Sequence, residues 1–274
     1  MKKIISLIVV AVMLALTLCA CGDDGKINEE NLVPVMVGVS VGRSPQDEVM
    51  YGLELHFPEN GHKLVYKEYE TSEQALEALE KGEIDFSLIS RKCEYEAFGS
   101  DEILNLGPVY FYPLAVYLKA FDTKAEITDC ASIAIPDDAE GMARALMLLD
   151  AEGYITLKEG AGLNATLEDI ETNKKEFKIS AVTHKDVATS GADILVMGSE
   201  EARAAGLERR FDGLVSEKSE SEAAIQYATV CLVRKADIRT EKIELVEKYF
   251  FTRRMFNAID ASTANIIEPM FELK

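Results

Sequence analysis

The pattern of apolar positions predicts strands that alternate with helices. Residues 33–41 alternate valine with Pro34, Met36, Gly38 and Ser40, which is typical of a strand. A second strand at 64–69 precedes Thr71-Ser72-Glu73-Gln74, a capping-box pattern that begins a helix to residue 81. Gly82 is placed to end that helix, and residues 84–89 supply the next strand. Because strand–helix–strand units pair their strands in parallel, we expect a parallel sheet.

The same order returns in the second half of the chain. The apolar spacing predicts a helix over residues 139–151, capped by Asp137 or Asp138, and a long amphipathic helix over 241–260. Shorter helical stretches are expected near His184 and at 200–205. Further strands are predicted at 131–136, 179–182, 194–197 and 227–233. We therefore expect an α/β protein of two lobes.

The first residues have the pattern of a secretory signal. Lys2 and Lys3 precede about 15 mostly apolar residues, and the segment closes with Leu18-Cys19-Ala20-Cys21. This ending resembles the lipobox of bacterial lipoproteins, which implies removal of residues 1–20 and a lipid on Cys21. The chain would then be held at the extracytoplasmic face of a cell membrane, with residues 21–32 as a polar tether. A retained signal anchor is the alternative, but the apolar run is shorter than the roughly 20 residues of a membrane span.

Charge and cysteine usage exclude several classes of function. The formal net charge is −19, which disfavours nucleic acid and anionic lipid headgroups as partners. Cys93, Cys130 and Cys231 form no CxxC or Cys/His spacing, so we expect no metal site and no cofactor. The chain also lacks a Gly-x-Ser-x-Gly elbow and a P-loop, and an enzyme is not expected.

Several short motifs together resemble the methionine-binding lipoprotein family of ABC importers, also called the NlpA lipoprotein family. In chain order they include Val37-Gly38-Val39-Ser40, Gly82-Glu83-Ile84-Asp85, Gly107-Pro108, Ile133-Ala134-Ile135-Pro136-Asp137-Asp138, Leu157-Lys158-Glu159-Gly160-Ala161-Gly162-Leu163 and Ala205-Gly206-Leu207. The resemblance implies a bilobal periplasmic-binding-protein fold of type II, whose two α/β lobes are joined by two crossing strands. It also implies an ABC permease and a small-molecule ligand as partners.

By position in that family, residues 33–112 and 229–274 would form the first lobe, and residues 113–228 the second. The crossings would lie near Pro113-Leu114-Ala115 and Ile225-Gln226-Tyr227. Such crossings absorb the closure of the lobes on a ligand.

Arg144 is the residue to which the resemblance assigns the ligand's carboxylate. It lies early in the helix predicted after Pro136-Asp137-Asp138, where a guanidinium fork and the positive end of the helix would face one cleft. Helix spacing alone favours another interpretation, a surface arginine paired with Glu140 one turn earlier.

The other positions of the family's pocket differ in this chain. Ile89, Arg91 and Glu94 stand where the family has aromatic and histidine residues, and Gly198, Glu200 and Thr229 stand where it has asparagines. Tyr110, Tyr112 and Tyr227 lie near the predicted crossings and could form an apolar wall, with Phe111 or its neighbours in the core. Two hypotheses remain open. The ligand has changed to another amino acid, a short peptide or another small carboxylate, or the chain is a ligand-free lipoprotein that docks a partner.

Overall fold

The computed structural model describes residues 29–42, 46–261 and 266–271. The predicted signal peptide, the lipidation site Cys21 and most of the predicted tether lie outside these residues. Within the described ranges, no helix is both long and apolar enough to cross a bilayer.

The first sheet is built around a buried valine-rich strand. Val35, Val37 and Val39 of this strand are fully buried. The strand pairs in parallel with both of its neighbours, as the strand–helix–strand pattern predicts. In spatial order the sheet contains β13 (Glu268–Pro269), β4 (Ile103–Phe111), β12 (Thr229–Arg234), β3 (Phe86–Ser87), β1 (Val33–Ser40) and β2 (His62–Tyr69).

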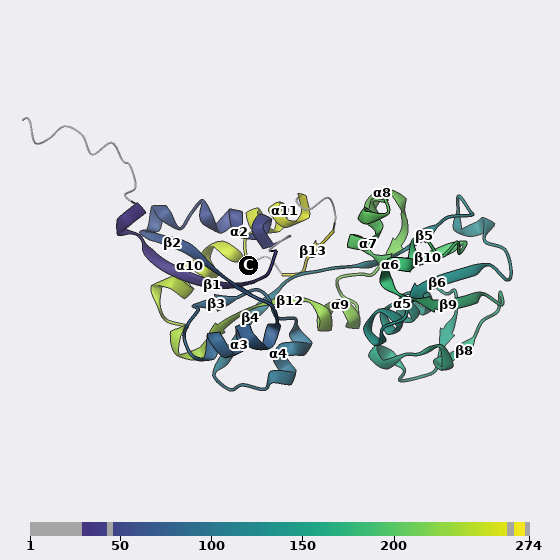
Figure 1. The fold of residues 1–274 in the computed structure, drawn as a ribbon, viewed down its shortest axis with the longest axis horizontal. Coiled ribbons are helices and arrows are strands. Elements are labelled where there is room, and N and C mark those ends of the chain that lie inside the picture. The colour runs from purple at the N-terminus through teal and green to yellow at the C-terminus, as the bar shows by residue number, and fades with distance from the viewer. Residues whose placement is uncertain (1–28, 43–45, 262–265, 272–274) are drawn as a thin grey trace, which may run out of the picture.

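Helices pack on both faces of this sheet (Figure 1). They are α2 (Gln46–Glu54), α3 (Ser72–Glu80), α4 (Lys92–Phe98), α10 (Glu241–Phe250) and α11 (Arg253–Ala261). The predicted start of α3 is confirmed, because the Thr71 side chain accepts a hydrogen bond from the Gln74 backbone N–H at 3.3 Å. Its predicted end is confirmed too, since Gly82 has a φ of +74°, a conformation that glycine adopts easily.

The second sheet has two parallel pairs and two antiparallel pairs. Its order is β11 (Gly213–Ser216), β5 (Leu114–Leu118), β10 (Ile194–Gly198), β6 (Ser132–Pro136) and β9 (Lys178–Val182). β6 is parallel to β9 and β10, whereas β5 is antiparallel to β10 and β11. The helices α5 (Ala139–Ala151), α6 (His184–Val187), α7 (Ser199–Ala204) and α8 (Arg209–Asp212) accompany it.

The helix α5 has the bounds that the sequence predicts. Asp138 caps it by accepting a hydrogen bond from the Gly141 backbone N–H at 2.9 Å. The remaining short elements are a small hairpin of β7 (Thr156–Leu157) and β8 (Ile170–Thr172), and the 3-10 helices η1 (Glu29–Asn31), η2 (Pro58–Asn60), η3 (Lys124–Glu126), η4 (Gly162–Asn164), η5 (Leu167–Asp169) and η6 (Lys235–Asp237).

The two sheets form two lobes that lie side by side along the longest axis of the molecule (Figure 1). The chain first passes between them at Tyr112-Pro113, between β4 and β5. It returns through residues 217–221, between β11 and the short helix α9 (Glu222–Tyr227). The expectation of a crossing strand at Ile225-Gln226-Tyr227 is therefore wrong. These residues are helical because Ser221 caps α9, accepting a hydrogen bond from the Ala224 backbone N–H at 3.0 Å.

Two other sequence predictions need correction. The helix predicted over 241–260 is two helices, because Phe251 leaves helical geometry with φ −90° and ψ 55°. Its ring instead packs edge to face on Phe250 and Phe271. The strand predicted at 84–89 keeps only residues 86–87 in the sheet, and the strand predicted from residue 227 begins at Thr229.

Candidate ligand-binding site

Most of the predicted ligand-binding residues line one pocket of about 370 Å³ on the first lobe. The pocket lies at the carboxyl ends of β1, β2 and β3, where open α/β sheets place their ligands. Its lining consists of Ser40, Glu70, Thr71, Ser72, Ile89, Arg91, Glu94, Tyr110, Tyr112 and Thr229. Six of these residues were predicted from the sequence, namely Ile89, Arg91, Glu94, Tyr110, Tyr112 and Thr229. The residues of the β2–α3 turn were not predicted.

Arg91 and Glu94 are positioned by the start of α4. The Glu94 carboxylate accepts a hydrogen bond from the Arg91 backbone N–H at 2.9 Å. The same carboxylate pairs with the Arg91 guanidinium, at 2.9 Å from Nη2 and 3.1 Å from Nε. An isolated bridge between Arg91 and Thr229 ties this helix start to β12. Both charged side chains are thus held at the pocket while they stay partly exposed.

Tyr110 and Tyr112 form an aromatic wall at the end of β4. Their rings meet edge to face, with centroids 5.8 Å apart. Tyr110 is 1% exposed, and Phe111 between them is buried against Ala224 and Ala228. Burial raises the pKa of the Tyr112 phenol, with further contributions from Tyr110 and from the carboxylate of Glu200. The phenol therefore stays neutral.

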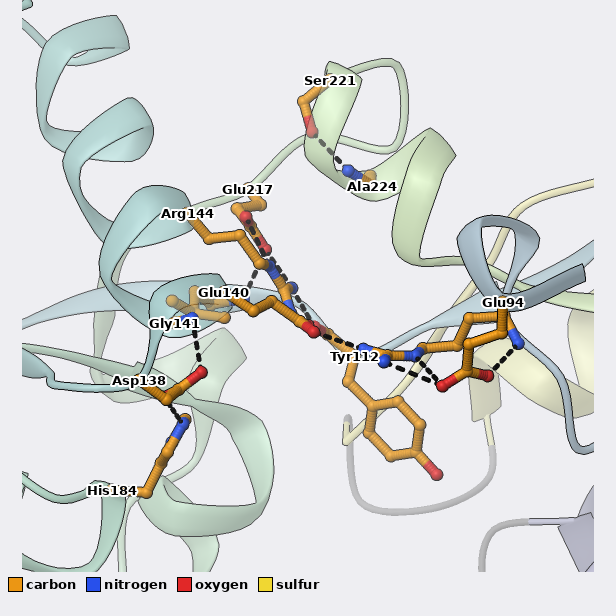
Figure 2. A network of polar contacts seen from close by, with 12 residues as sticks. Glu94, Tyr112, Asp138, Glu140, Gly141, Arg144, His184, Glu217, Ser221 and Ala224 are labelled. Carbon is orange, nitrogen blue, oxygen red and sulfur yellow. Dashed lines mark hydrogen bonds and ion pairs between the residues drawn. The ribbon is translucent and has the colours of Figure 1, made fainter. Parts of the chain in front are cut away.

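Arg144 lies on the second lobe and is already engaged with the protein's own carboxylates (Figure 2). The residue is only 7% exposed. Its Nε is 3.1 Å from Glu217 Oε1 and its Nη2 is 2.6 Å from Glu217 Oε2, which is a bidentate pair. Nη2 also donates to the backbone carbonyl of Tyr112 at 2.6 Å. A ligand carboxylate at Arg144 would have to displace Glu217.

Glu140 links the two lobes by bridging two arginines. Its Oε1 accepts from Arg144 Nη1 at 3.1 Å, and its other oxygen contacts Arg91 Nη1 of the first lobe. The ring of Tyr227 lies beside both guanidiniums, with centroid distances of 5.4 Å to Arg91 and 5.5 Å to Arg144. The pairing of Arg144 with Glu140 that helix spacing predicts is therefore present, within a larger network.

Glu217 is the residue of this network that the sequence did not identify. It is 6% exposed, and it also accepts the Leu114 backbone N–H at 2.8 Å. Burial by itself would lower the pKa of the Arg144 guanidinium, but Glu217 and Glu140 raise it above its ordinary value. Arg144 thus keeps its charge although it is buried. The sequence signal that could have identified Glu217 is its position, an acidic residue directly after the strand at 213–216.

Gly198 and Glu200 lie apart from the pocket lining. Gly198 ends β10 and Glu200 belongs to the first turn of α7. Desolvation raises the pKa of the Glu200 carboxyl, and the neighbouring Glu201 adds to this effect. Among the described residues, no group of His, Cys, Asp and Glu has the arrangement of a metal site.

A larger cavity of about 440 Å³ lies elsewhere on the second lobe. Lys124, Tyr154, Lys174 and Phe177 are among its lining residues. None of the predicted ligand-binding residues borders this cavity, so we do not identify it with the ligand site.

The two lobes and the order of the first sheet define the class of protein. Two α/β lobes joined by two connections, with the strand order β2-β1-β3-β12-β4 in the first sheet, form the periplasmic-binding-protein fold of type II. The NlpA lipoprotein family model matches residues 35–271, and the chain belongs to this family.

Individual relatives agree with that assignment. The D-methionine-binding lipoprotein MetQ of Escherichia coli K12 is 27% identical over 259 residues, which cover 89% of each chain. A periplasmic substrate-binding protein of an ABC transporter from Coxiella burnetii has a TM-score of 0.62 and 25% identity, over 86% of this chain and 99% of the other. A YaeC-family lipoprotein from Enterococcus faecalis V583 has a TM-score of 0.69 and 23% identity, over 87% and 99% of the two chains, and shows the same fold.

Proposed function

We propose that the chain is the membrane-anchored substrate-binding lipoprotein of an ABC importer. Its ligand would be an amino acid, a short peptide or another small carboxylate, captured between the two lobes. Membership of the NlpA lipoprotein family and the likeness to a periplasmic substrate-binding protein of an ABC transporter support this proposal. The observation that carries it is the pocket at the carboxyl ends of the parallel strands, lined by residues of five separate segments.

The lipid on Cys21 would keep this carrier at the extracytoplasmic face of the membrane, close to its permease. Replacing the cysteine by serine removes the thiol that the lipid needs. We expect Cys21→Ser to move from the membrane fraction to the soluble fraction, while the matched Cys93→Ser stays in the membrane fraction. A Cys21→Ser protein that remains with the membrane would contradict the anchor.

Ligand binding can be tested on the mature lipoprotein purified in detergent. Native mass spectrometry identifies what the protein retains, and thermal unfolding then measures its effect. A ligand at 100 times its dissociation constant adds about 2.7 kcal/mol to the free energy of unfolding. Tyr112→Ala removes part of the pocket wall and should reduce this stabilisation. Tyr51→Ala removes an aromatic ring that is 61% exposed on α2, and it should leave the response unchanged.

A ligand-free lipoprotein that docks a partner is the second candidate. The internal pairing of Arg91 and Arg144 with Glu94, Glu140 and Glu217 favours it, because these charges need no ligand for neutralisation. If no retained small molecule is found and no amino acid, peptide or other carboxylate shifts the unfolding temperature, the importer proposal fails and docking is favoured. Turnover of any of these compounds would instead indicate an enzyme.

A further inference from the structure

The pocket on the first lobe has more negative than positive charge. Its lining contains the carboxylates of Glu70 and Glu94 and a single guanidinium, that of Arg91. Arg91 is itself shared between Glu94 and Glu140, so it has little positive charge left to offer a ligand. No ion pair engages the carboxylate of Glu70 among the described residues, and its backbone N–H binds Gln74. The electrostatic surroundings therefore favour a ligand with a positive group at this position.

The nearby positive charge of Arg144 is not available to compensate. Nε and Nη2 are used by Glu217 and by the Tyr112 carbonyl, and Nη1 is used by Glu140. Removing Glu217 from the guanidinium would leave two buried charges without their partner. Glu217 thus occupies the position that an α-carboxylate needs if it is to bind Arg144.

The rest of the lining suits the body of an organic cation. Tyr110, Tyr112 and Ile89 give an apolar and aromatic surface, and aromatic faces attract ammonium and guanidinium groups. Thr71 and Ser72 add hydroxyls to the lining. The volume of about 370 Å³ falls in the range of pockets that hold small molecules.

We propose that this pocket binds a small organic cation, a primary amine or guanidinium on a short aliphatic body, and that Glu217 excludes an α-carboxylate from Arg144. Basic amino acids and diamines belong to this class. The proposal rests on the proposed function, since it names the ligand class of the same site. A methionine-like ligand would bring only its α-ammonium to this pocket, without a second positive group, and its carboxylate would meet Arg144 already paired with Glu217.

The test compares ligands that carry or lack a cationic side-chain group or a carboxylate, by isothermal titration calorimetry on the mature lipoprotein in detergent. The probes are L-lysine against L-norleucine, L-arginine against L-citrulline, cadaverine and agmatine without a carboxylate, and L-methionine. We expect at least one cationic member to bind at least about tenfold more tightly than its neutral counterpart. Binding of cadaverine or agmatine at a similar affinity would show that the carboxylate contributes little.

Variants connect this selectivity with the pocket. Glu70→Gln should weaken binding of the cation about tenfold, whereas Glu73→Gln, an equal change of charge three residues further on in α3 and outside this pocket, should not. Glu217→Gln should allow norleucine or methionine to bind more tightly by a similar factor, through the released Arg144. Circular dichroism checks that each variant is folded. If Glu217→Gln does not fold, the comparison of Glu70→Gln with Glu73→Gln still tests the proposal.

The outcomes separate the two proposals. Binding of methionine, norleucine or citrulline as tightly as the cations overturns the cation assignment and leaves an importer intact. Equal cation affinities in Glu70→Gln and Glu73→Gln also overturn it. If no amino acid, amine, peptide or small carboxylate binds, both proposals fail together.

Discussion

Glu217→Ala is expected to destabilise the protein far more than an ordinary loss of one surface charge. Glu217 is 6% exposed and holds two nitrogens of Arg144 together with the Leu114 backbone N–H. Alanine leaves Arg144, a residue only 7% exposed, with Glu140 as its remaining charged partner. It also removes the acceptor of a buried backbone donor at the start of β5.

The magnitude follows from these losses. Breaking a buried ion pair by removing one partner costs about 3–5 kcal/mol, because the other charge stays buried. The unsatisfied Leu114 N–H would contribute to that cost, in the range of about 1–3 kcal/mol for a lost buried partner, while relaxation of Arg144 toward Glu140 offsets part of it. We therefore expect a total loss of about 3–5 kcal/mol. With a urea m-value of about 3 kcal/mol/M, the unfolding midpoint should fall by about 1–1.7 M.

Urea unfolding followed by far-ultraviolet circular dichroism is the suitable assay, since the chain contains no tryptophan for fluorescence. Glu220→Ala, at an exposed position three residues further on, is the matched control and should change stability by at most about 0.5 kcal/mol. The double variant Arg144→Met/Glu217→Ala should lose less than the sum of the single losses, by about 1.5 kcal/mol or more. A Glu217→Ala midpoint equal to that of Glu220→Ala would refute the reasoning.

Three further predictions concern the lobe contact, pH and the thiols. Arg91→Gln removes the ion pair with Glu140 between the lobes. This ion pair is worth at most about 1 kcal/mol because both groups are partly exposed. Without ligand, small-angle X-ray scattering should show a larger mean radius of gyration for the variant than for the wild type. Desolvation raises the pKa of the Asp138 carboxyl, but hydrogen bonds and the charge of its histidine neighbour lower that pKa further, to below 3.8. The stabilising effect of the charged carboxylate is therefore present above pH 3.8 and is lost as the pH falls through the pKa of the folded state. Melting curves of Asp138→Asn and wild type should converge in acid. Cys130 is exposed, whereas Cys231 is fully buried and its thiol pKa is raised by that burial. Maleimide should therefore label Cys130 in the native protein and Cys231 only after unfolding.

The sequence predicted those elements whose signals are local. The helix α5 was predicted with its correct bounds because Asp138 caps it and its apolar residues repeat at helical spacing. The break at Phe251 could not be seen in the same manner. Ile243, Val246 and Phe250 are buried before it and Met255 and Ile259 after it, so the apolar spacing runs on through the break. Only the packing of Phe251 on other rings, including one from the end of the chain, shows where the helix stops.

At the short helix α9, the sequence prediction was wrong about the type of element, because a strand was expected at Tyr227. An apolar run over residues 227–233 favoured a strand from Tyr227 onward, and this prediction contains all of β12 except its last residue. The Ser221 cap, six residues earlier, is the local signal that places Tyr227 at the end of a helix instead. The shift matters for the site, because it puts the Tyr227 ring beside two guanidiniums.

The arrangement around Arg144 depends on contacts between residues far apart in the chain. Glu140 lies one helical turn away and could be identified by spacing, whereas Glu217 lies 73 residues away on the returning segment between the lobes. No periodicity connects those positions. For a ligand carboxylate to take the place of Glu217, the displaced carboxylate would have to find another partner in a buried site, at a cost of several kcal/mol. Under the proposal, the discrimination between ligands would therefore fall to the first-lobe pocket, whose lining includes Glu70 and Glu94.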